Sequence, residues 1–463
     1  MTSYKSRRVD FFEDDRFPMQ DPYPVTPFTT PVRGSVTVPG SKSITNRALI
    51  IAALADGETL LENCLFSEDT EIMIKALQEL GFNVRPDPNA KTIRVHGLSG
   101  EIPNKKAELF VGNSGTSARF LTAFLCLSKG GDYTLDGVPQ MRKRPIVDLA
   151  TTLNQLGANI ETTDGFAPLR IRSSGLTGGR ASIDASSSSQ FVSALVMAAP
   201  YAENGIEIIL EDTSVRRSYI DMTLAMLKQF GVPKSALSSS EQGYLIQNFI
   251  PYQAKPEGYL VEGDASAASY FFALPVAVTG ELEIHGVTQE SLQGDIAFSG
   301  RMEEAGAYIV WEKHSATVHY EPGAKPESLE GSFYPYSDTF LTAAAVAPLF
   351  NGTTSIEEIG HTRHQECDRI AAMADGLQRL GQKVQETEGS LTITPQPLQP
   401  ATIATYHDHR VAMSFGVLGC FDALGNGQPW LQVEDPTCCK KTFPDFFQVL
   451  EKLRQDSLTS ATL

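Results

Sequence analysis

ALQELGFNV (residues 76–84) joins a helical pattern of apolar residues to a glycine and then to a short strand pattern. Phrases of the same kind begin at four later positions: TLNQLGANI at Thr152, MLKQFGVPK at Met226, RMEEAGAYI at Arg301 and GLQRLGQKV at Gly376. Each closing glycine stands where the C-terminal cap of a helix favours a residue that tolerates positive φ. The phrase therefore predicts a repeated helix–glycine–strand unit.

The closing glycines are evenly spaced along the chain. They are separated by 76, 74, 75 and 75 residues, and they are Gly81, Gly157, Gly231, Gly306 and Gly381. One more period ends near Arg454, at the close of the helical pattern FFQVLEKLRQ. This spacing argues against chance recurrence, and its period is longer than that of the common solenoids. We therefore expect six units.

Hairpin patterns follow the glycine in four of these units. Apolar and polar residues alternate on both sides of turn residues in 83–95, 159–172, 308–320 and 383–395. The unit is therefore expected to be α/β with a hairpin. A chain of 463 residues is too long for one compact core, so two or three lobes are expected.

Composition narrows the function classes. A formal net charge of −17 argues against binding to nucleic acid or to an anionic membrane surface. The six cysteines show no CxxC pair and no spacing typical of a metal site. The N-terminus lacks the apolar segment of a secretory signal, and the longest apolar run, residues 191–202, is too short to cross a bilayer. A cytoplasmic location is expected.

An anionic small substrate would need a local cluster of cations in so acidic a chain. VPGSKSITNRAL places Lys42, Ser43 and Arg47 at the start of an apolar helical pattern, and GNSGTSAR places Gly115 and Arg119 at another. The N-terminus of a helix directs free N–H groups towards an anion. A capped surface helix would show the same pattern, so each stretch alone is a weak signal.

Further polar residues share this character. The loop MRKR could bind an anion through Arg144 or could be a solvated loop, and SSSSQ precedes another apolar helix. In the C-terminal half, Glu366 and Arg369 would share a helix face if their segment is helical. A structural ion-pair network could also use the charged residues of this half, which are Asp338, Glu366, Arg369, Arg410 and Lys441.

Taken in order, these phrases resemble the EPSP synthase (3-phosphoshikimate 1-carboxyvinyltransferase) family between about Pro31 and Phe447. The blocks are PGSKSITNRAL, GNSGTSAR, DGVPQMRKRPI, SSQFVSALVMAAP, VEGDASAASYF, GDIAF, YHDHRVAM and DPTCCKKTFPDFF. The resemblance implies a two-lobed enolpyruvyl transferase fold, an inside-out α/β barrel of six βαβαββ units. It places residues 40–257 in a central lobe, and residues 1–39 plus 258–463 in the other.

The resemblance also assigns residues to two sides of a cleft. The phosphoenolpyruvate side would use Lys42, Arg144, Arg369, Arg410 and Lys441, beside an anion loop with Asn113, Gly115 and Arg119. The side that binds the acceptor, shikimate 3-phosphate, would use Lys42, Ser43, Arg47, Ser188, Ser189, Gln190, Tyr219 and Asp338.

The implied reaction moves a carboxyvinyl group from phosphoenolpyruvate to the acceptor's hydroxyl. Proton transfer near carbon suits carboxylates, so Asp338 and Glu366, with Lys42, are the candidate catalytic residues. Fixed cations would stabilise the developing charge. The resemblance implies a monomer that uses no metal and no organic cofactor.

Three acceptor-side positions depart from the family pattern. Gln365 stands where the family has a lysine, His361 replaces an asparagine, and Arg216 occupies a position that is often a serine near the acceptor's phosphate. Glutamine carries no charge and cannot act as a base at neutral pH. Either His361, His364 or Arg216 compensates, or the chain is a paralogue acting on a different cyclitol or catalysing a related elimination. A non-catalytic ligand-binding homologue is the third alternative.

Overall fold

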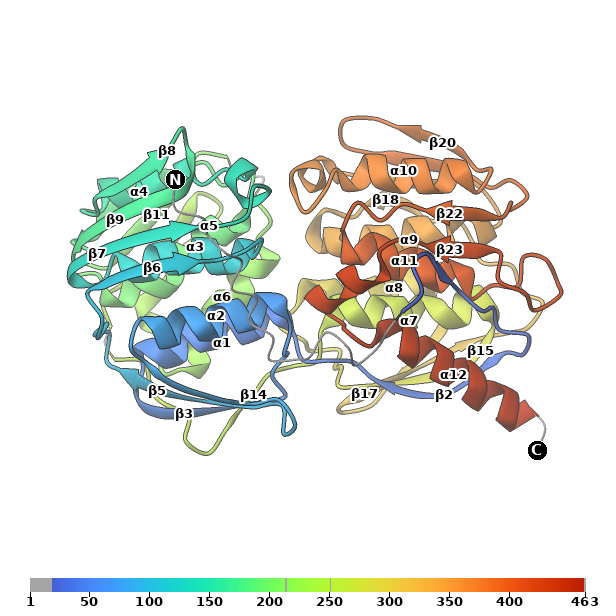
Figure 1. The fold of residues 1–463 in the computed structure, drawn as a ribbon, viewed down its shortest axis with the longest axis horizontal. Helices are drawn as coiled ribbons and strands as arrows, with labels where there is room; N and C mark the ends of the chain where they lie inside the picture. The colour runs from blue at the N-terminus through green and yellow to red at the C-terminus, as the bar shows by residue number, and fades with distance from the viewer. Residues whose placement is uncertain (1–18, 213–214, 250, 462–463) are drawn as a thin grey trace.

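The structure is a computed structural model that describes residues 19–212, 215–249 and 251–461. Figure 1 shows two lobes side by side. The central lobe has a hydrophobic core of buried residues between Ile44 and Val261. The terminal lobe has a second core, from Val25 to Val38 and from Ala267 to Leu453. Residues 1–18, which the sequence assigns to this second lobe, lie outside the described range.

Three units show the repeat without interruption, as strand, helix, strand, helix and a hairpin. The first comprises β6 (Lys106–Phe110), α3 (Gly115–Leu125), β7 (Lys129–Asp136), α4 (Val147–Gln155), β8 (Ile160–Thr163) and β9 (Phe166–Ser174). The second comprises β10 (Gly179–Ile183), α5 (Ser189–Ala198), β11 (Ile206–Leu210), α6 (Ser218–Gln229), β12 (Leu237–Ser240) and β13 (Gly243–Ile246). The third, in the terminal lobe, comprises β18 (Glu330–Ser332), α9 (Phe340–Val346), β19 (Thr354–Glu357), α10 (Arg369–Arg379), β20 (Lys383–Glu386) and β21 (Leu391–Thr394).

All three units have the same sheet topology. The strand orders are β6-β7-β9-β8, β10-β11-β13-β12 and β18-β19-β21-β20. In each, the first two strands are parallel and the hairpin joins antiparallel to the second.

Two further units exchange their first strands between the lobes. β2 (Val32–Thr37) pairs in parallel with β15 (Gly280–His285) of the terminal lobe, yet it leads into α1 (Lys42–Leu54) of the central lobe. β14 (Tyr259–Leu260) pairs in parallel with β3 (Asp56–Glu62) of the central lobe and leads into α7 (Ala265–Val278) of the terminal lobe. These units are completed by α2 (Glu68–Glu79), β4 (Asn83–Asp87), β5 (Thr92–Leu98), α8 (Phe298–Glu304), β16 (Tyr308–Trp311) and β17 (Ser315–Tyr320).

The chain therefore crosses twice between the lobes, at Gly40 and Gly263, which form an antiparallel bridge. A Cβ atom on Gly40 would lie 1.8 Å from the carbonyl oxygen of Asn63, and one on Gly263 would lie 2.4 Å from that of Gly286. These two carbonyl oxygens leave no room for a side chain at either crossing, so both positions require glycine.

The sixth unit differs in its sheet. It comprises β22 (Ala401–Ile403), α11 (His409–Gly419), β23 (Leu431–Val433) and α12 (Phe446–Ala461). In place of a hairpin, β1 (Tyr23–Pro24) pairs antiparallel with β23. The helix expected to end near Arg454 is present, but it continues to Ala461.

The closing glycines have the predicted conformation. Their φ angles are positive, at +92° for Gly81, +100° for Gly157, +95° for Gly231, +102° for Gly306 and +84° for Gly381. The four predicted hairpins are present as β4–β5, β8–β9, β16–β17 and β20–β21.

The helices fill the lobes and the sheets lie outside them (Figure 1). Every residue of α3 is buried, as is every residue of α1 from Ile44 onwards. The six-unit, two-lobed fold expected from the sequence is confirmed. Over the described residues, its strands form six separate small sheets rather than one closed barrel. Among the described helices, none combines the length and apolar character needed to cross a membrane.

Candidate active site

An open cleft of about 920 Å³ receives residues from both lobes. The central lobe contributes Lys42, Ser43, Arg47, Asp69, Gly115, Thr116, Arg119, Arg144, Pro145, Ser187, Ser188, Ser189, Gln190, Phe191, Arg216 and Tyr219. The terminal lobe contributes Asp338, His364, Gln365, Glu366, Arg369, His409 and Arg410.

Five helices begin at this cleft. The first residues of α1, α3, α5, α10 and α11 line it, and each helix has a side-chain cap before it. The cap residues accept a hydrogen bond from the first turn, and they are Ser41, Ser114, Ser188, Asp368 and Asp408. Converging helix N-termini create a positive potential before any side-chain charge is counted.

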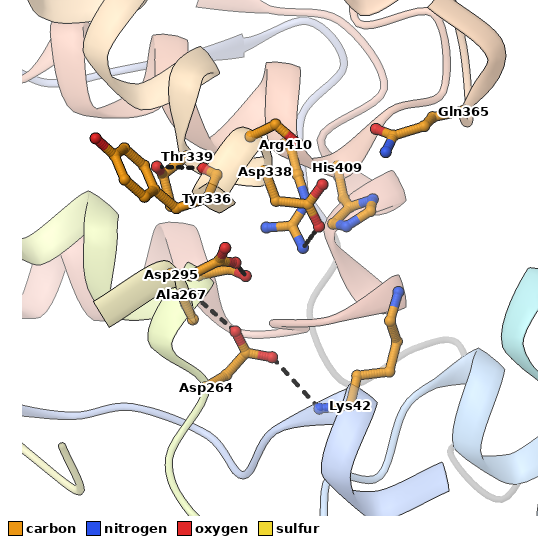
Figure 2. Close-up of polar contacts among 12 residues, drawn as sticks. Lys42, Asp264, Ala267, Asp295, Tyr336, Asp338, Thr339, Gln365, His409 and Arg410 are labelled. Atoms are coloured by element: carbon orange, nitrogen blue, oxygen red, sulfur yellow. Dashed lines mark hydrogen bonds and ion pairs between the residues drawn. The ribbon is translucent and has the colours of Figure 1, made fainter. Parts of the chain in front are cut away.

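An ionised carboxylate lies between arginines in the terminal lobe. Arg410 Nη2 is 2.9 Å from Asp338 Oδ2 (Figure 2). Arg369 Nη1 is 3.2 Å from Asp338 Oδ1. Burial raises the pKa of Asp338, but Arg410, and then Arg369, outweigh burial and lower the pKa below its ordinary value. Asp338 is therefore ionised, and the arginines that keep it ionised also make it a weaker base than an ordinary aspartate.

Glu366 forms the second carboxylate of the cleft. Its Oε2 is 2.9 Å from Arg369 Nη2, and its Oε1 is 3.5 Å from Lys441 Nζ. Burial raises the pKa of Glu366, but Arg369 and Lys441 hold it well below its usual range. The expected i,i+3 contact between Glu366 and Arg369 is present, although α10 begins only at Arg369 and Glu366 precedes the helix.

Asp69 joins lysines from the two lobes. Its Oδ2 is 3.3 Å from Lys42 Nζ, and its Oδ1 is 3.7 Å from Lys441 Nζ. Burial lowers the pKa of Lys441, but Asp69 and Glu366 raise it above its ordinary value. Lys441 Nζ also donates to the carbonyl oxygen of Asn113 at 3.3 Å, a second contact between the lobes.

The loop before α4 separates its cations. In the 3₁₀ helix η1 (Met141–Lys143), Arg142 turns away and pairs with Asp136, its Nε donating to Oδ1 at 2.8 Å. Arg144 turns into the cleft, where its Nη1 donates to the carbonyl oxygen of Asn113 at 3.4 Å. For Arg142 the solvated-loop interpretation is therefore correct, and for Arg144 the anion-site interpretation is supported.

Two further arginines are held rigidly by protein atoms. Arg47 is buried and donates to Thr223 Oγ1 at 2.7 Å and to Ser193 Oγ at 3.1 Å. Arg119 is buried and donates to the carbonyl oxygen of Pro145 at 2.9 Å. Burial lowers the pKa of both.

Two of the three acceptor-side departures, Arg216 and His361, share one hydrogen-bonded group. Arg216 Nη1 donates to Ser337 Oγ at 2.7 Å, and Ser337 Oγ lies 2.8 Å from His361 Nε2. Ser337 belongs to the 3₁₀ helix η5 (Tyr334–Thr339) and His361 to η7 (Gly360–His364). Gln365 Oε1 accepts a hydrogen bond from Arg369 Nη1.

Most predicted site residues meet at the cleft. Three predicted residues do not line the cleft. Asn113 contacts Arg144 and Lys441 contacts Glu366, both of which line it, and His361 contacts Ser337, the neighbour of Asp338. The cleft-lining residues not assigned from the sequence are Asp69, Thr116, Pro145, Ser187, Phe191, His364 and His409. Of these, the sequence indicates His364 only as a group that could compensate for Gln365, and His409 stands in the YHDHRVAM block.

His409 is the least explained of them. Burial, and then Arg410, lower its pKa well below the ordinary value, so the imidazole is neutral. Neither of its ring nitrogens has a hydrogen-bond partner within the described part of the chain. In that same part, no group of three or more His, Cys, Asp or Glu side chains is placed to hold a metal ion.

Comparisons with known proteins agree with this architecture. The family model for EPSP synthase (3-phosphoshikimate 1-carboxyvinyltransferase) matches residues 28–450. A protein of Opitutus terrae named 3-phosphoshikimate 1-carboxyvinyltransferase is 47% identical over 447 residues, covering 95% of this chain and 99% of its own. A protein of Nostoc punctiforme with the same name is 42% identical over 431 residues, covering 91% and 97%.

A solved structure has the same fold. The EPSP synthase of Acinetobacter baumannii aligns with a TM-score of 0.77 at 24% identity, covering 93% of this chain and 97% of its own. Because the family model spans nearly the whole molecule and relatives above 40% identity cover both chains, this protein belongs to the EPSP synthase family.

Proposed function

We propose that this protein transfers the enolpyruvyl group of phosphoenolpyruvate to the 5-hydroxyl of shikimate 3-phosphate and releases phosphate. The observation that carries the proposal is a cleft between two lobes in which two ionised carboxylates, Asp338 and Glu366, stand among cations from both sides. The relatives named above carry this one activity in their names. We also propose that the protein acts as a monomer in the cytoplasm.

The donor, phosphoenolpyruvate, carries up to three negative charges on a phosphate and a carboxylate that lie close together. Cations that converge from both lobes suit it: Lys42, Arg144, Arg369, Arg410 and Lys441. The loop of Asn113, Gly115 and Arg119 would complete this side, with the free N–H groups at the start of α3 facing a phosphate.

The acceptor would occupy the neighbouring part of the cleft. Hydroxyl and amide groups there can bind its hydroxyls and phosphate, from Ser43, Ser188, Ser189, Gln190, Tyr219 and Gln365. Tyr219 OH donates to Asp338 Oδ2 at 3.3 Å, so an acceptor bound beside Tyr219 would have its hydroxyls near the carboxylate. Arg47 would hold the acceptor side of the cleft in place through its hydrogen bond to Ser193, and His361 would do so through Ser337.

The reaction proceeds by addition and elimination. The acceptor oxygen forms a bond to C2 of the donor while C3 gains a proton, which gives a tetrahedral ketal phosphate. The bond between C2 and the phosphate oxygen then breaks, and C3 loses a proton, so the vinyl group is restored and phosphate leaves. Each half needs one proton acceptor and one proton donor beside carbon or oxygen.

The described carboxylates suit the accepting role. Asp338 is ionised and could accept a hydrogen bond from the acceptor's hydroxyl beside that of Tyr219. The arginines that lower its pKa weaken it as a base, so it would take the hydroxyl proton only when the substrate anions neutralise those arginines. Glu366 lies beside Lys441 on the donor side. With a proton taken up from solvent when the substrate anions are bound, it could give that proton to C3 in the addition and take one back from C3 in the elimination. Lys42, paired with Asp69, can stabilise the charge that develops on the phosphate.

We further propose that residues 40–257 and residues 1–39 plus 258–463 move as two bodies that close on the substrates. The contacts of Lys441 with Asp69 and Asn113 would stabilise the closed state.

Steady-state phosphate release tests this function directly. Purified protein is supplied with both substrates, and release is expected to require both and to saturate with each. The variant Glu366→Gln is expected to lose about 10²-fold or more in kcat. The matched variant Glu386→Gln, at an exposed position on β20, should keep full activity. Release without the acceptor, or equal rates in the two variants, would contradict the proposal.

A further inference from the structure

Behind the cleft, the terminal lobe buries a carboxyl group that has no part in the reaction described above. We propose that this group, Asp295, is a positioning residue for the donor: it is a neutral carboxylic acid while the protein is active, and its ionisation draws the positive charge of Arg410 away from the donor's anion. The inference rests on the proposed function, because it takes Arg410 as part of the donor side. Asp295 itself does not line the cleft.

Asp295 is held next to the crossing between the lobes. It lies in the 3₁₀ helix η4 (Gly294–Ala297), directly after Gln293. Gln293 Nε2 donates to the carbonyl oxygen of Gly263 at 2.7 Å, and Gln293 Oε1 accepts from the backbone N–H of Ala265 at 3.2 Å. These bonds fix η4 against the start of α7, so the backbone at Asp295 has little freedom to move.

The carboxyl group of Asp295 is buried without a cation of its own. The residue is 4% exposed, and its Oδ2 accepts a hydrogen bond from Ser266 Oγ. Over the described residues, no lysine, arginine or histidine lies within ion-pair distance of it, whereas Asp338 has Arg369 at 3.2 Å and Arg410 at 2.9 Å. An unpaired carboxylate is costly to bury, so the protonated form of Asp295 is favoured.

The charges around Asp295 favour the same state. Figure 2 shows it between Asp264 and the pair formed by Asp338 and Arg410. Burial, and then the charge of Asp338, raise the pKa of Asp295 to about 7, while Arg410 and Ser266 lower it by less. The two neighbouring carboxyl groups thus hold one proton between them at neutral pH, and the arginines beside Asp338 leave that proton on Asp295.

The other elements packed against η4 bring no further cation to Asp295 within the described part of the chain. α7 brings Asp264, which raises the pKa of Asp295 further. α6 brings Tyr219, whose own pKa is raised by burial and then by Asp295, so it remains a neutral phenol. On α8, which continues from η4, Arg301 is paired with Glu304 at 2.7 Å. Arg410 is therefore the cation that senses the charge of Asp295.

Ionisation of Asp295 changes the charge that Arg410 offers to the donor. While Asp295 is neutral, Arg410 faces the carboxylate of Asp338 and also lines the cleft. Once Asp295 has lost its proton, a second carboxylate acts on the same guanidinium, and a partly neutralised cation stabilises an anion less. The kcat/KM for phosphoenolpyruvate is therefore expected to fall as Asp295 ionises.

Asp295→Asn separates this effect from the ionisation of the substrates. The amide has the shape of the protonated carboxyl group but cannot ionise. Initial rates are measured at varied donor concentration for both proteins, and their ratio isolates residue 295 because both see the same substrates. The kcat/KM of the variant relative to the unaltered protein should be about one at about pH 5.5 and rise to about fivefold at about pH 8.5.

Ser266→Ala is a second variant that leaves the carboxyl group in place. It removes the hydroxyl that favours the ionised form, so the fall in kcat/KM should move to higher pH than in the unaltered protein. Glu290→Gln is the matched control, because it removes an exposed carboxylate from the loop that precedes η4 and should leave the pH profile unchanged.

Infrared difference spectra report the proton itself. Between about pH 6 and about pH 8.5 the unaltered protein should lose the C=O band of a protonated carboxyl group, and Asp295→Asn should lack that band. A ratio of kcat/KM that is the same at every pH would show a merely structural role for Asp295. That result, an unshifted profile in Ser266→Ala, or absence of the band would overturn the inference. Absence of turnover in the unaltered protein would instead contradict the proposed function, and the band would still show whether Asp295 holds a proton.

Discussion

The backbone N–H of Lys42 donates to Asp264 Oδ2 at 3.3 Å, which links the first residue of α1 in the central lobe to the cap residue of α7 in the terminal lobe (Figure 2). The other oxygen of Asp264 accepts from the backbone N–H of Ala267 at 2.9 Å. One carboxylate thus satisfies the N-termini of two helices on opposite sides of the crossing. It also fixes the start of the helix that presents the Lys42 ammonium to the cleft.

Asp264→Ala should weaken both the fold and the site. The loss of a helix cap costs about 1 kcal/mol, and up to about 2 kcal/mol, in free energy of unfolding. Because Lys42 loses its backbone anchor, kcat should fall as well. Urea unfolding and phosphate release measure the two effects. Asp264→Asn retains an acceptor for one N–H and should recover most of the stability, so equal stability of Asp264→Ala and the unaltered protein would contradict this account.

Gly115→Ala should impair donor binding selectively. A Cβ atom at this position would lie 2.8 Å from Arg144 Nη2, so the guanidinium must move away from the cleft. The KM for phosphoenolpyruvate is expected to rise about tenfold, equivalent to one weakened charge-assisted hydrogen bond, with a smaller change in the KM for the acceptor. Initial-rate measurements at varied donor concentration test this. A larger effect on the acceptor than on the donor would show that Arg144 serves the other side.

Asp69→Asn should disturb the two lysines that it joins. With the negative charge gone, Lys42 and Lys441 repel each other across the lobes, and Lys441 loses a group that raises its pKa. The alkaline limb of the pH profile of kcat/KM should therefore move to lower pH. Glu79→Gln removes a charge from the far end of the same helix and serves as the control. An unchanged pH profile in Asp69→Asn would contradict the role of Asp69 in raising the pKa of Lys441.

His361 should make the protein sensitive to acid. Its pKa is lowered from 6.5 to about 3 by burial and then by Arg216, so between these values the unfolded state binds a proton that the folded state does not. The neutral His361 ring therefore makes its full contribution to the free energy of unfolding above about pH 6.5, and this contribution is lost as the pH falls towards 3. Thermal unfolding between pH 7 and 4 should show a steeper loss for the unaltered protein than for His361→Asn.

The control for this experiment is His96→Asn, which removes an exposed imidazole on β5. Its acid-dependent loss of stability should match that of the unaltered protein. Parallel curves for all three proteins would mean that His361 is already free to ionise in the folded state.

Local patterns predicted what depends on local structure. The closing glycines, such as Gly157, must adopt positive φ, and this requirement is visible in the sequence as a repeat. The helix starts that line the cleft were also predictable, because caps such as Ser114 directly precede an apolar helix. Repetition and capping are short-range features, so they need no knowledge of the tertiary fold.

Contacts through space could not be read in this way. Asp69 resembles any acidic residue in the first turn of a helix, and its role follows only from lysines that the fold brings to it from both lobes. In the same way, three adjacent cations gave no indication that Arg142 would pair with Asp136 while Arg144 turned into the cleft. The exchange of β2 and β14 between lobes is likewise a property of the pairing partners, which a strand pattern does not specify.

The identity of the product tests the central claim most directly. The protein is incubated with phosphoenolpyruvate and shikimate 3-phosphate, and the product is analysed by mass spectrometry and by proton NMR. The account predicts one equivalent of phosphate and an enolpyruvyl ether at the 5-hydroxyl, with two vinyl proton signals. Recovery of both substrates unchanged, or of pyruvate and phosphate without an ether, would contradict it.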